Sequence, residues 1–202
     1  MNEEESNKVI KKQGIISGIL LGIIITLLSI FSFYYLTEMV TSTILIVVGY
    51  FVLFPIVLPI ASAVFFILRL RTKIGGYWSF KQAVRGIFII FLIAFLVQVL
   101  IKDIAFTKFV EPNILEKTEK ALLNDAVIDF KKKKVSQKDI DAKVKEIRSN
   151  LDSQKQVTAA QQIQGIGIRI IFLFVLALIF AAFFKREVLY YNSPNTGPVS
   201  KD

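Results

Sequence analysis

The sequence has no cysteine and no histidine among its 202 residues. Without cysteine there are no disulfides and no thiol catalysis, and without histidine there is no Ser-His-Asp triad. Together these absences exclude zinc sites of the Cys/His type and haem held by histidine. No other catalytic, metal-binding or cofactor motif takes their place, so we expect neither an enzyme nor a bound cofactor.

Charge is nearly absent from four long apolar runs, in which Arg169 is the only Asp, Glu, Lys or Arg. The runs are Gly14 to Leu36, Ile44 to Leu68, Gly86 to Ile101 and Gly165 to Phe184. Roughly 20 helical residues cross a hydrocarbon core of about 30 Å. Because the runs are apolar on every face, they differ from the amphipathic helices of a soluble core. The sequence therefore predicts an all-α integral membrane protein with four transmembrane helices.

These runs divide the chain into five parts. They are a cytoplasmic N-terminal tail (1–13), transmembrane helices one to three (14–106), an extracytoplasmic amphipathic helical segment (107–163), transmembrane helix four (164–186) and a cytoplasmic C-terminal tail (187–202). The first run is longer than the apolar part of a secretory signal, which has about 7 to 15 residues, and no small-x-small cleavage pattern follows it. We expect it to be an uncleaved span.

The chain has a net charge of +9, and many of its basic residues stand next to the ends of the apolar runs. Basic residues flank the runs on one expected side: Lys8, Lys11, Lys12, Arg69, Arg71, Lys73, Lys81, Arg85, Lys185, Arg186 and Lys201. The link Thr37 to Thr43 has none, as an external loop should. We expect a multi-pass protein of the cell (inner) membrane with both termini cytoplasmic. The segment 102–164 is also basic, but segments longer than about 60 residues are translocated largely regardless of charge. Since the membrane divides the basic residues, nucleic-acid binding is disfavoured.

The segment between the third and fourth runs predicts two amphipathic helices. Apolar residues recur at Leu115, Leu122, Ala126 and Phe130, and again at Ile140, Val144, Ile147 and Leu151, with the lysine run 131–134 between the two sets. Ser136 and Asp139 form a capping-box pattern at the start of the second helix. Two interpretations stay open: an extracytoplasmic helical hairpin, or helices lying on the membrane surface with the lysines near anionic headgroups.

Small residues and prolines suggest how the helices pack. Gly14, Gly18 and Gly22 form a stripe at spacing four, where another backbone can approach closely. Its neighbour is either a helix of the same chain or a second copy in a homo-oligomer. Pro55 and Pro59 predict a kink in the second helix. Kinks recur in transporters and channels, and also in membrane proteins that transport nothing.

Arg169 is predicted to lie about one turn inside the outer membrane boundary. Three interpretations stay open: its side chain extends to the interface, it pairs with Asp103 or Gln98 at the end of the third helix, or it belongs to an ion or substrate site. No carboxylate lies near the middle of any run, which disfavours proton-coupled transport.

The stretch GGYWSFKQA (75–83) precedes the third helix. Its two glycines allow a tight turn, and Ser79 is a plausible N-cap. Tyr77 and Trp78 are predicted to be interfacial anchors, with Arg85 at the inner boundary. In the functional alternative, Tyr77, Trp78 and Arg85 form a site for a partner or a lipid headgroup.

Three stretches carry a resemblance. GGYWSFKQA (75–83) resembles the "GGYISFGQAF"-like start of the third helix in a bacterial family known as domain of unknown function 4199. FVEPNILEK (109–117) is similar to the segment after that helix, and VSQKDIDAKVKEI (135–147) looks like the family's "lsdeqie"-type helix start. The likeness covers most of 10–186. It implies a small four-helix membrane protein, typical of Bacteroidota, whose function is unassigned, and it supplies no active-site residues.

These observations favour a non-enzymatic membrane protein with a structural or a protein- or lipid-interaction role. The alternative is a small transporter or channel subunit. The expected partners are the lipid bilayer, a membrane or extracytoplasmic protein, or a second copy of the chain.

Overall fold

Four helical segments of the computed structural model are long and apolar enough to cross a membrane. They are Glu4–Met39, Ile44–Lys73, Phe80–Val110 and Ile163–Phe184. The structure describes residues 3–40, 42–132, 136–155 and 158–186, and no strand occurs among them. The prediction of an all-α chain with four such helices is confirmed.

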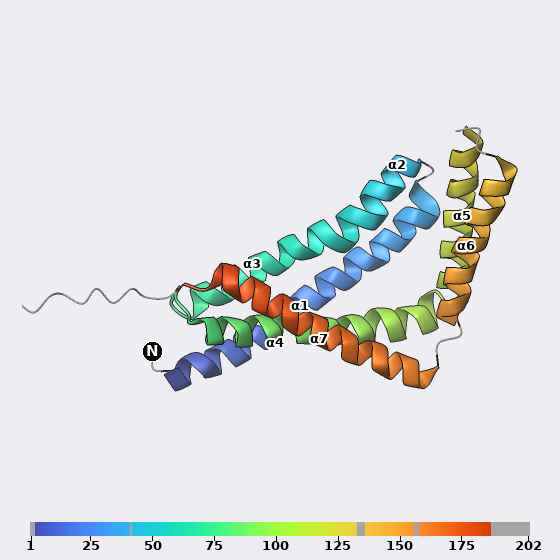
Figure 1. Cartoon of the computed structure of the whole chain (residues 1–202). Helices are drawn as coiled ribbons and strands as arrows, with labels where there is room; N and C mark the ends of the chain where they lie inside the picture. The colour runs from blue at the N-terminus through green and yellow to red at the C-terminus, as the bar shows by residue number, and fades with distance from the viewer. Residues whose placement is uncertain (1–2, 41, 133–135, 156–157, 187–202) are drawn as a thin grey trace, which may run out of the picture.

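Ten helical elements make up the described chain (Figure 1). The first span is α1 (Glu3–Tyr34) with η1 (Tyr35–Met39); the second is α2 (Thr43–Ile46), η2 (Val47–Val57) and α3 (Leu58–Lys73); the third is α4 (Phe80–Gln98) with η3 (Val99–Val110). Two helices, α5 (Ile114–Lys132) and α6 (Gln137–Lys155), precede the fourth span, which lies in α7 (Ala159–Phe184). The η elements are π-helices, in which each N–H bonds five residues back.

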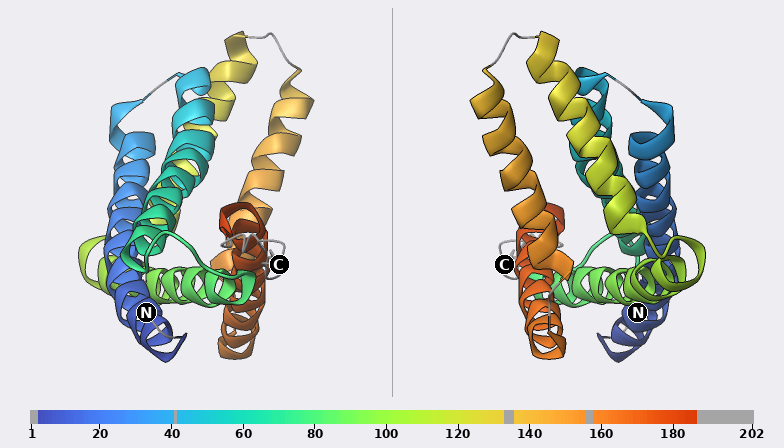
Figure 2. Two further views of the ribbon diagram at one scale, coloured as in Figure 1. Left: turned by 90° about the vertical axis from the view of Figure 1, so that its left-hand side faces the viewer. Right: turned by 90° about the vertical axis from the view of Figure 1, so that its right-hand side faces the viewer.

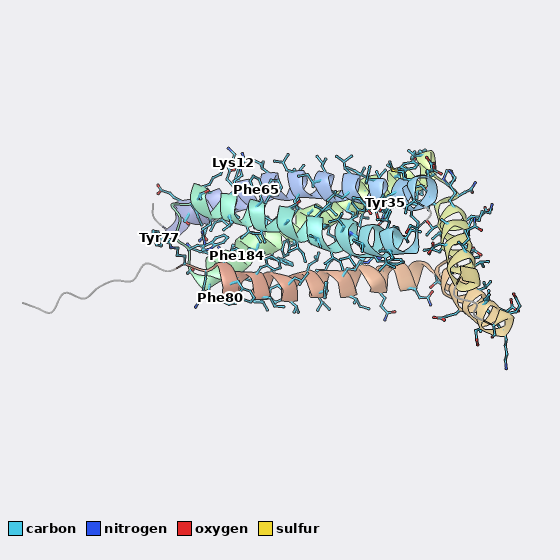
Figure 3. The ribbon with its side chains drawn as sticks, turned by 90° about the horizontal axis from the view of Figure 1, so that it is seen from above. Lys12, Tyr35, Phe65, Tyr77, Phe80 and Phe184 are labelled. Carbon is cyan, nitrogen blue, oxygen red and sulfur yellow. The ribbon has the colours of Figure 1, made fainter. Side chains whose placement is uncertain are left out.

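The bundle has two distinct ends. One, here called the Trp78 end, holds the start of α1, the α3–α4 loop and the end of α7; Figure 3 labels Tyr77, Phe80 and Phe184 there. At the opposite Glu111 end, η3 passes into α5. The helices α5 and α6 pack against each other and run across this end rather than continuing the spans (Figure 1).

The central contact is between α1 and α4, which run parallel. A Cβ at Gly18 would lie 2.7 Å from Ile93 Cβ and 2.9 Å from the carbonyl oxygen of Ile90. A Cβ at Gly22 would likewise lie 2.7 Å from Val97 Cβ. The glycine stripe therefore faces α4 of the same chain. Any side chain at Gly18 or Gly22 would force α1 and α4 further apart.

The other spans pack around this pair. α3 contacts α1, and α7 contacts α4; Figure 2 has α1 and α3 side by side, with α7 on the other side of the molecule. The best-buried core lies toward the Trp78 end, where the side chains of Ile10, Leu70, Ile87 and Ala181 are fully buried.

The two prolines flank a change of helix type in the second span. Pro55 lies inside η2, and Pro59 lies in the first turn of α3. Proline cannot donate, so the ladder bond from residue 55 to the carbonyl of Tyr50, five residues earlier, cannot form. All three π-helical segments lie in the Glu111 half of their spans.

Several local predictions meet the structure directly. Ser79 caps α4 with a full capping box, as predicted, and Gly75 and Gly76 have φ of 99° and 84° in the preceding turn. The Ser136 hydroxyl accepts from the Asp139 N–H at 3.3 Å and so caps α6. The side chains of the lysine run 131–134 and of Phe130, Ile147 and Leu151, like the tail 187–202, lie outside the described part.

Candidate functional site

Two neighbouring cavities open among the spans. The first, here called the apolar cavity, has a volume of about 400 Å³ and is lined by Leu21, Ile25, Pro55, Ile56, Pro59, Ile60, Ala63, Phe91, Ala94, Phe172, Leu173, Leu176 and Phe180. The second, here called the Lys102 cavity, has a volume of about 480 Å³ and is lined by Ser29, Ser32, Phe33, Tyr50, Phe51, Pro55, Ile56, Lys102 and Ile114. Pro55 and Ile56 line both, so the two cavities share a wall.

The order of the lining residues along each span explains this arrangement. In α1, Leu21 and Ile25 line the apolar cavity, and Ser29 lines the Lys102 cavity one turn further on. In the third span, Ala94 lines the first and Lys102 the second. The apolar cavity thus lies at the middle of the spans, and the Lys102 cavity lies next to it, nearer the Glu111 end.

The apolar cavity has an exposed rim. Ile56, Ile60 and Phe172 line it, and their exposed fractions are 48%, 49% and 61%. These side chains lie on η2, α3 and α7, within segments that are long and apolar enough to span a membrane. The cavity therefore opens sideways onto the apolar surface of the bundle.

The Lys102 cavity is polar on one side. Ser29, Ser32 and Tyr50 contribute hydroxyl groups, and Lys102 contributes an ammonium group. Lys102 is half-buried, and among the described residues no carboxylate oxygen lies within 4.0 Å of its Nζ. Two π-helical segments supply Tyr50 and Lys102, and such segments often occur at functional sites.

The predicted pairing partners Arg169 and Asp103 lie close together, although neither lines this cavity. Arg169 Nη1 is 3.9 Å from Asp103 Oδ2, and their side chains are 64% and 44% exposed. The structure thus brings the two residues together in a long, exposed ion pair. The alternative partner Gln98 is half-buried at the end of α4, and among the described residues no hydrogen bond joins it to Arg169.

At the Trp78 end, the two predicted anchors behave differently. Tyr77 is exposed, and the guanidinium carbon of Arg186 lies 5.2 Å from its ring centroid. Trp78 is only 2% exposed, and its indole N–H donates to the carbonyl oxygen of Phe184. The prediction of Trp78 as an interfacial anchor is wrong, because the tight turn before α4 directs the indole into the core beside α7.

Arg85 lies at a cavity whose lining includes neither Tyr77 nor Trp78. This cavity has a volume of about 350 Å³, lies between α4 and α7 and is also lined by Lys81, Phe88 and Phe174. The small residues of the stripe, Gly14, Gly18 and Gly22, pack against α4 and line none of the three cavities.

A polar cluster attaches α5 to the bundle. Lys117 Nζ lies 2.7 Å from Glu111 Oε2, and the Tyr34 hydroxyl donates to Glu111 Oε1 at 3.3 Å. The Glu111 side chain is only 12% exposed. The hydrogen bond from the Lys117 ammonium lowers the pKa of the Glu111 carboxyl, and the same bond raises the pKa of Lys117.

Sequence reasoning missed both the Lys102 cavity and the Glu111 cluster. Ser29 and Ser32 stand three residues apart in an apolar run, so they lie on one face of α1, a signal that was present. Lys102 at the end of the third run looked like an ordinary boundary residue. No sequence signal says that the spans leave space beside it.

The described residues hold no group of three or more Asp or Glu side chains that could bind a metal ion. A family model whose description reads "Protein of unknown function (DUF4199)" matches residues 13–186. Comparison with curated proteins gives no match, and comparison with solved structures gives none either.

Proposed function

Because the chain belongs to the DUF4199 family of proteins of unknown function, we propose from its own geometry that it is a non-enzymatic inner-membrane protein that binds a lipid between its spans. The observation that carries the proposal is the apolar cavity, which opens sideways at Ile56, Ile60 and Phe172. The medium outside such an opening in a membrane is hydrocarbon, so an acyl chain is the occupant that can enter it. Its volume of about 400 Å³ is in the range of small-molecule sites.

The lining supports a binding role rather than catalysis. A Ser-Lys pair would need the ammonium within hydrogen-bond reach of the serine hydroxyl. Ser29, Ser32 and Lys102 line one cavity, but no hydrogen bond joins Lys102 to either serine in the described part of the chain. The apolar cavity offers no titratable side chain at all among its lining residues.

The proposal includes an orientation. The Trp78 end is cytoplasmic, and α5 and α6 form an extracytoplasmic helical hairpin. Support comes from Arg71 and Lys73 in the last turn of α3 and from Lys185 and Arg186 after α7, all at the Trp78 end. The hairpin then lies over the outer mouth of the Lys102 cavity, where Ile114 is part of the lining. A protein partner would meet the chain on this hairpin.

The lipid proposal is tested by closing the cavity from its rim. Ile60→Trp fills the opening from α3, and Phe65→Trp places the same side chain on an exposed position of α3 that lines no described cavity. Each variant is extracted in lipid nanodiscs and then transferred to detergent. Native mass spectrometry then counts the lipid molecules that remain bound to the protein. We expect Ile60→Trp to lose the bound lipid and Phe65→Trp to keep it. Equal retention in the two variants would remove the proposal.

The second candidate is a small transporter or channel subunit. Pro55 lies in a π-helical segment that lines both cavities, and interrupted helices often form the substrate sites of transporters. Reconstitution into proteoliposomes decides between the two functions. Saturable flux of an ion or solute through the parent protein would favour the transporter, and its absence with retained lipid favours the binding protein.

A further inference from the structure

We propose that the bound lipid is anionic, with its acidic headgroup in the Lys102 cavity and its acyl chain in the apolar cavity. This inference rests on the proposed function, since it names the class of lipid held between the spans. It follows from the donors in the polar cavity, from the charges around it and from the wall that the two cavities share.

The donors of the Lys102 cavity suit an anion. The Lys102 ammonium has three N–H donors and no acceptor, and each hydroxyl of Ser29, Ser32 and Tyr50 has one donor. No Asp or Glu is among the lining residues. A phosphate or carboxylate headgroup would present acceptor oxygens to all of these groups.

Among the described residues, no carboxylate pairs with the Lys102 ammonium within 4.0 Å. Asp103 is its neighbour in sequence, but its carboxylate faces Arg169 at 3.9 Å. Glu111 is engaged by Lys117 and Tyr34 at the start of α5. Charged groups within membrane spans normally pair with an opposite charge. An anionic ligand would supply that charge to the half-buried Lys102.

The shared wall identifies the source of the anion as a lipid. Because Pro55 and Ile56 line both cavities, the two lie next to each other, and the proposed lipid would place its headgroup beside Lys102 and its chain beside Ile60 and Phe172. A free phosphate ion would fill only the polar cavity and would gain nothing from the apolar one. A neutral lipid would leave Lys102 unpaired.

The test compares headgroups in a defined bilayer. The full-length chain is reconstituted in nanodiscs of equimolar phosphatidylcholine and phosphatidylglycerol, and native mass spectrometry measures the ratio of the two lipids that stay bound. We expect the parent to retain phosphatidylglycerol about fivefold over its share, which is the preference that one lysine gives an anionic lipid. Lys102→Gln should retain lipid without this preference, and Lys102→Arg should restore it.

Lys108→Gln is the matched control, because Lys108 is an exposed lysine of the same π-helical segment and lines neither cavity. It should keep the preference of the parent. The headgroup inference is overturned if Lys102→Gln keeps the preference, if the parent has none, or if inorganic phosphate displaces the bound phosphatidylglycerol. These outcomes leave the lipid proposal standing, whereas undiminished lipid retention in Ile60→Trp would overturn that proposal itself.

Discussion

The indole N–H of Trp78 donates a 2.8 Å hydrogen bond to the carbonyl oxygen of Phe184, across 106 residues of sequence. Two backbone hydrogen bonds between Trp78 and Arg186, of 2.9 and 3.3 Å, join the same two segments. The carbonyl of Phe184 belongs to the last turn of α7, where intrahelical donors have run out. Trp78 thus attaches the end of the fourth span to the loop before the third.

Replacing this indole should destabilise the Trp78 end. Trp78→Phe removes the N–H and leaves the Phe184 carbonyl without its donor. It also creates a small cavity beside Gly86, where a Cβ placed on the glycine would lie 3.1 Å from the indole ring. We expect a loss of about 1–3 kcal/mol in the free energy of unfolding. Circular dichroism in detergent measures it as a lower Tm, since the variant has no tryptophan left for fluorescence.

Tyr77→Phe is the control for that experiment. Tyr77 is 48% exposed, and phenylalanine keeps the aromatic face over which the Arg186 guanidinium lies. Its Tm should stay close to that of the parent. If both variants melt alike, the hydrogen bond between Trp78 and Phe184 contributes nothing measurable.

The glycine stripe predicts a contrast between two glycine-to-alanine changes. The methyl group of Gly18→Ala would meet Ile93 Cβ at 2.7 Å and the backbone oxygen of Ile90 at 2.9 Å, so α1 and α4 must separate. We expect a loss of about 1–3 kcal/mol from this overpacking. Gly167→Ala meets nothing within 4 Å and should be neutral or gain up to about 1 kcal/mol from better helix propensity. Thermal unfolding in one detergent compares the two, and a destabilised Gly167→Ala would contradict the argument.

What the sequence could predict depended on how local the cause is. The four spans follow from apolar runs, and the cap at Ser79 follows from a pattern of four residues, so both were predictable. The neighbour of Gly18 and the burial of Trp78 depend on which spans lie side by side, and the sequence pattern leaves that open. The role of Lys102 was harder still to predict, because it depends on a space between three spans and no sequence pattern marks that space.

The Glu111 cluster predicts a pH window for the attachment of α5. The pKa of Glu111 is lowered below its ordinary 4.5 in the folded chain, so its contribution is present above pH 4.5 and is lost as the pH falls through the lowered pKa. The pKa of Lys117 is raised above 10.5, so its contribution is present below pH 10.5 and is lost as the pH rises through the raised pKa. Spin labels at Met39 and Asn124 should therefore report one α5–η1 distance within this window and a broader distribution in acid.

Glu111→Gln separates the cluster from general acid effects. The variant cannot titrate at residue 111, so the distance between the two labels should no longer change in acid. Glu38→Gln, at an exposed carboxylate of η1, should respond to acid as the parent does. An unchanged acid response in Glu111→Gln would exclude the cluster as its cause.

The proposed orientation predicts the side from which each end reacts. The chain has no cysteine, so Lys12→Cys and Lys138→Cys each give a single thiol at an exposed position. A membrane-impermeant maleimide should label Lys138→Cys in intact cells and Lys12→Cys only after permeabilisation. The reverse pattern would invert the orientation, and labelling of both from outside would contradict an odd number of crossings between them.

The last prediction concerns Arg169, whose distance of 3.9 Å from Asp103 is too long for a strong hydrogen bond. With side chains 64% and 44% exposed, the pair should have a coupling energy of about 0.2–1 kcal/mol in a double-mutant cycle of Arg169→Gln and Asp103→Asn. A coupling above about 2 kcal/mol would mean that the bilayer dehydrates the pair.

The pair should matter more for ligand choice than for stability. Asp103 is held toward Arg169, and removing the guanidinium frees this carboxylate to approach Lys102, its neighbour in sequence. Arg169→Gln should therefore weaken the preference for phosphatidylglycerol although Arg169 does not line the Lys102 cavity. Adding Asp103→Asn should restore the preference, because the competing carboxylate is then gone. If Arg169→Gln leaves the lipid ratio unchanged, Asp103 does not compete for Lys102, and the ion pair serves only to seat α7 against η3.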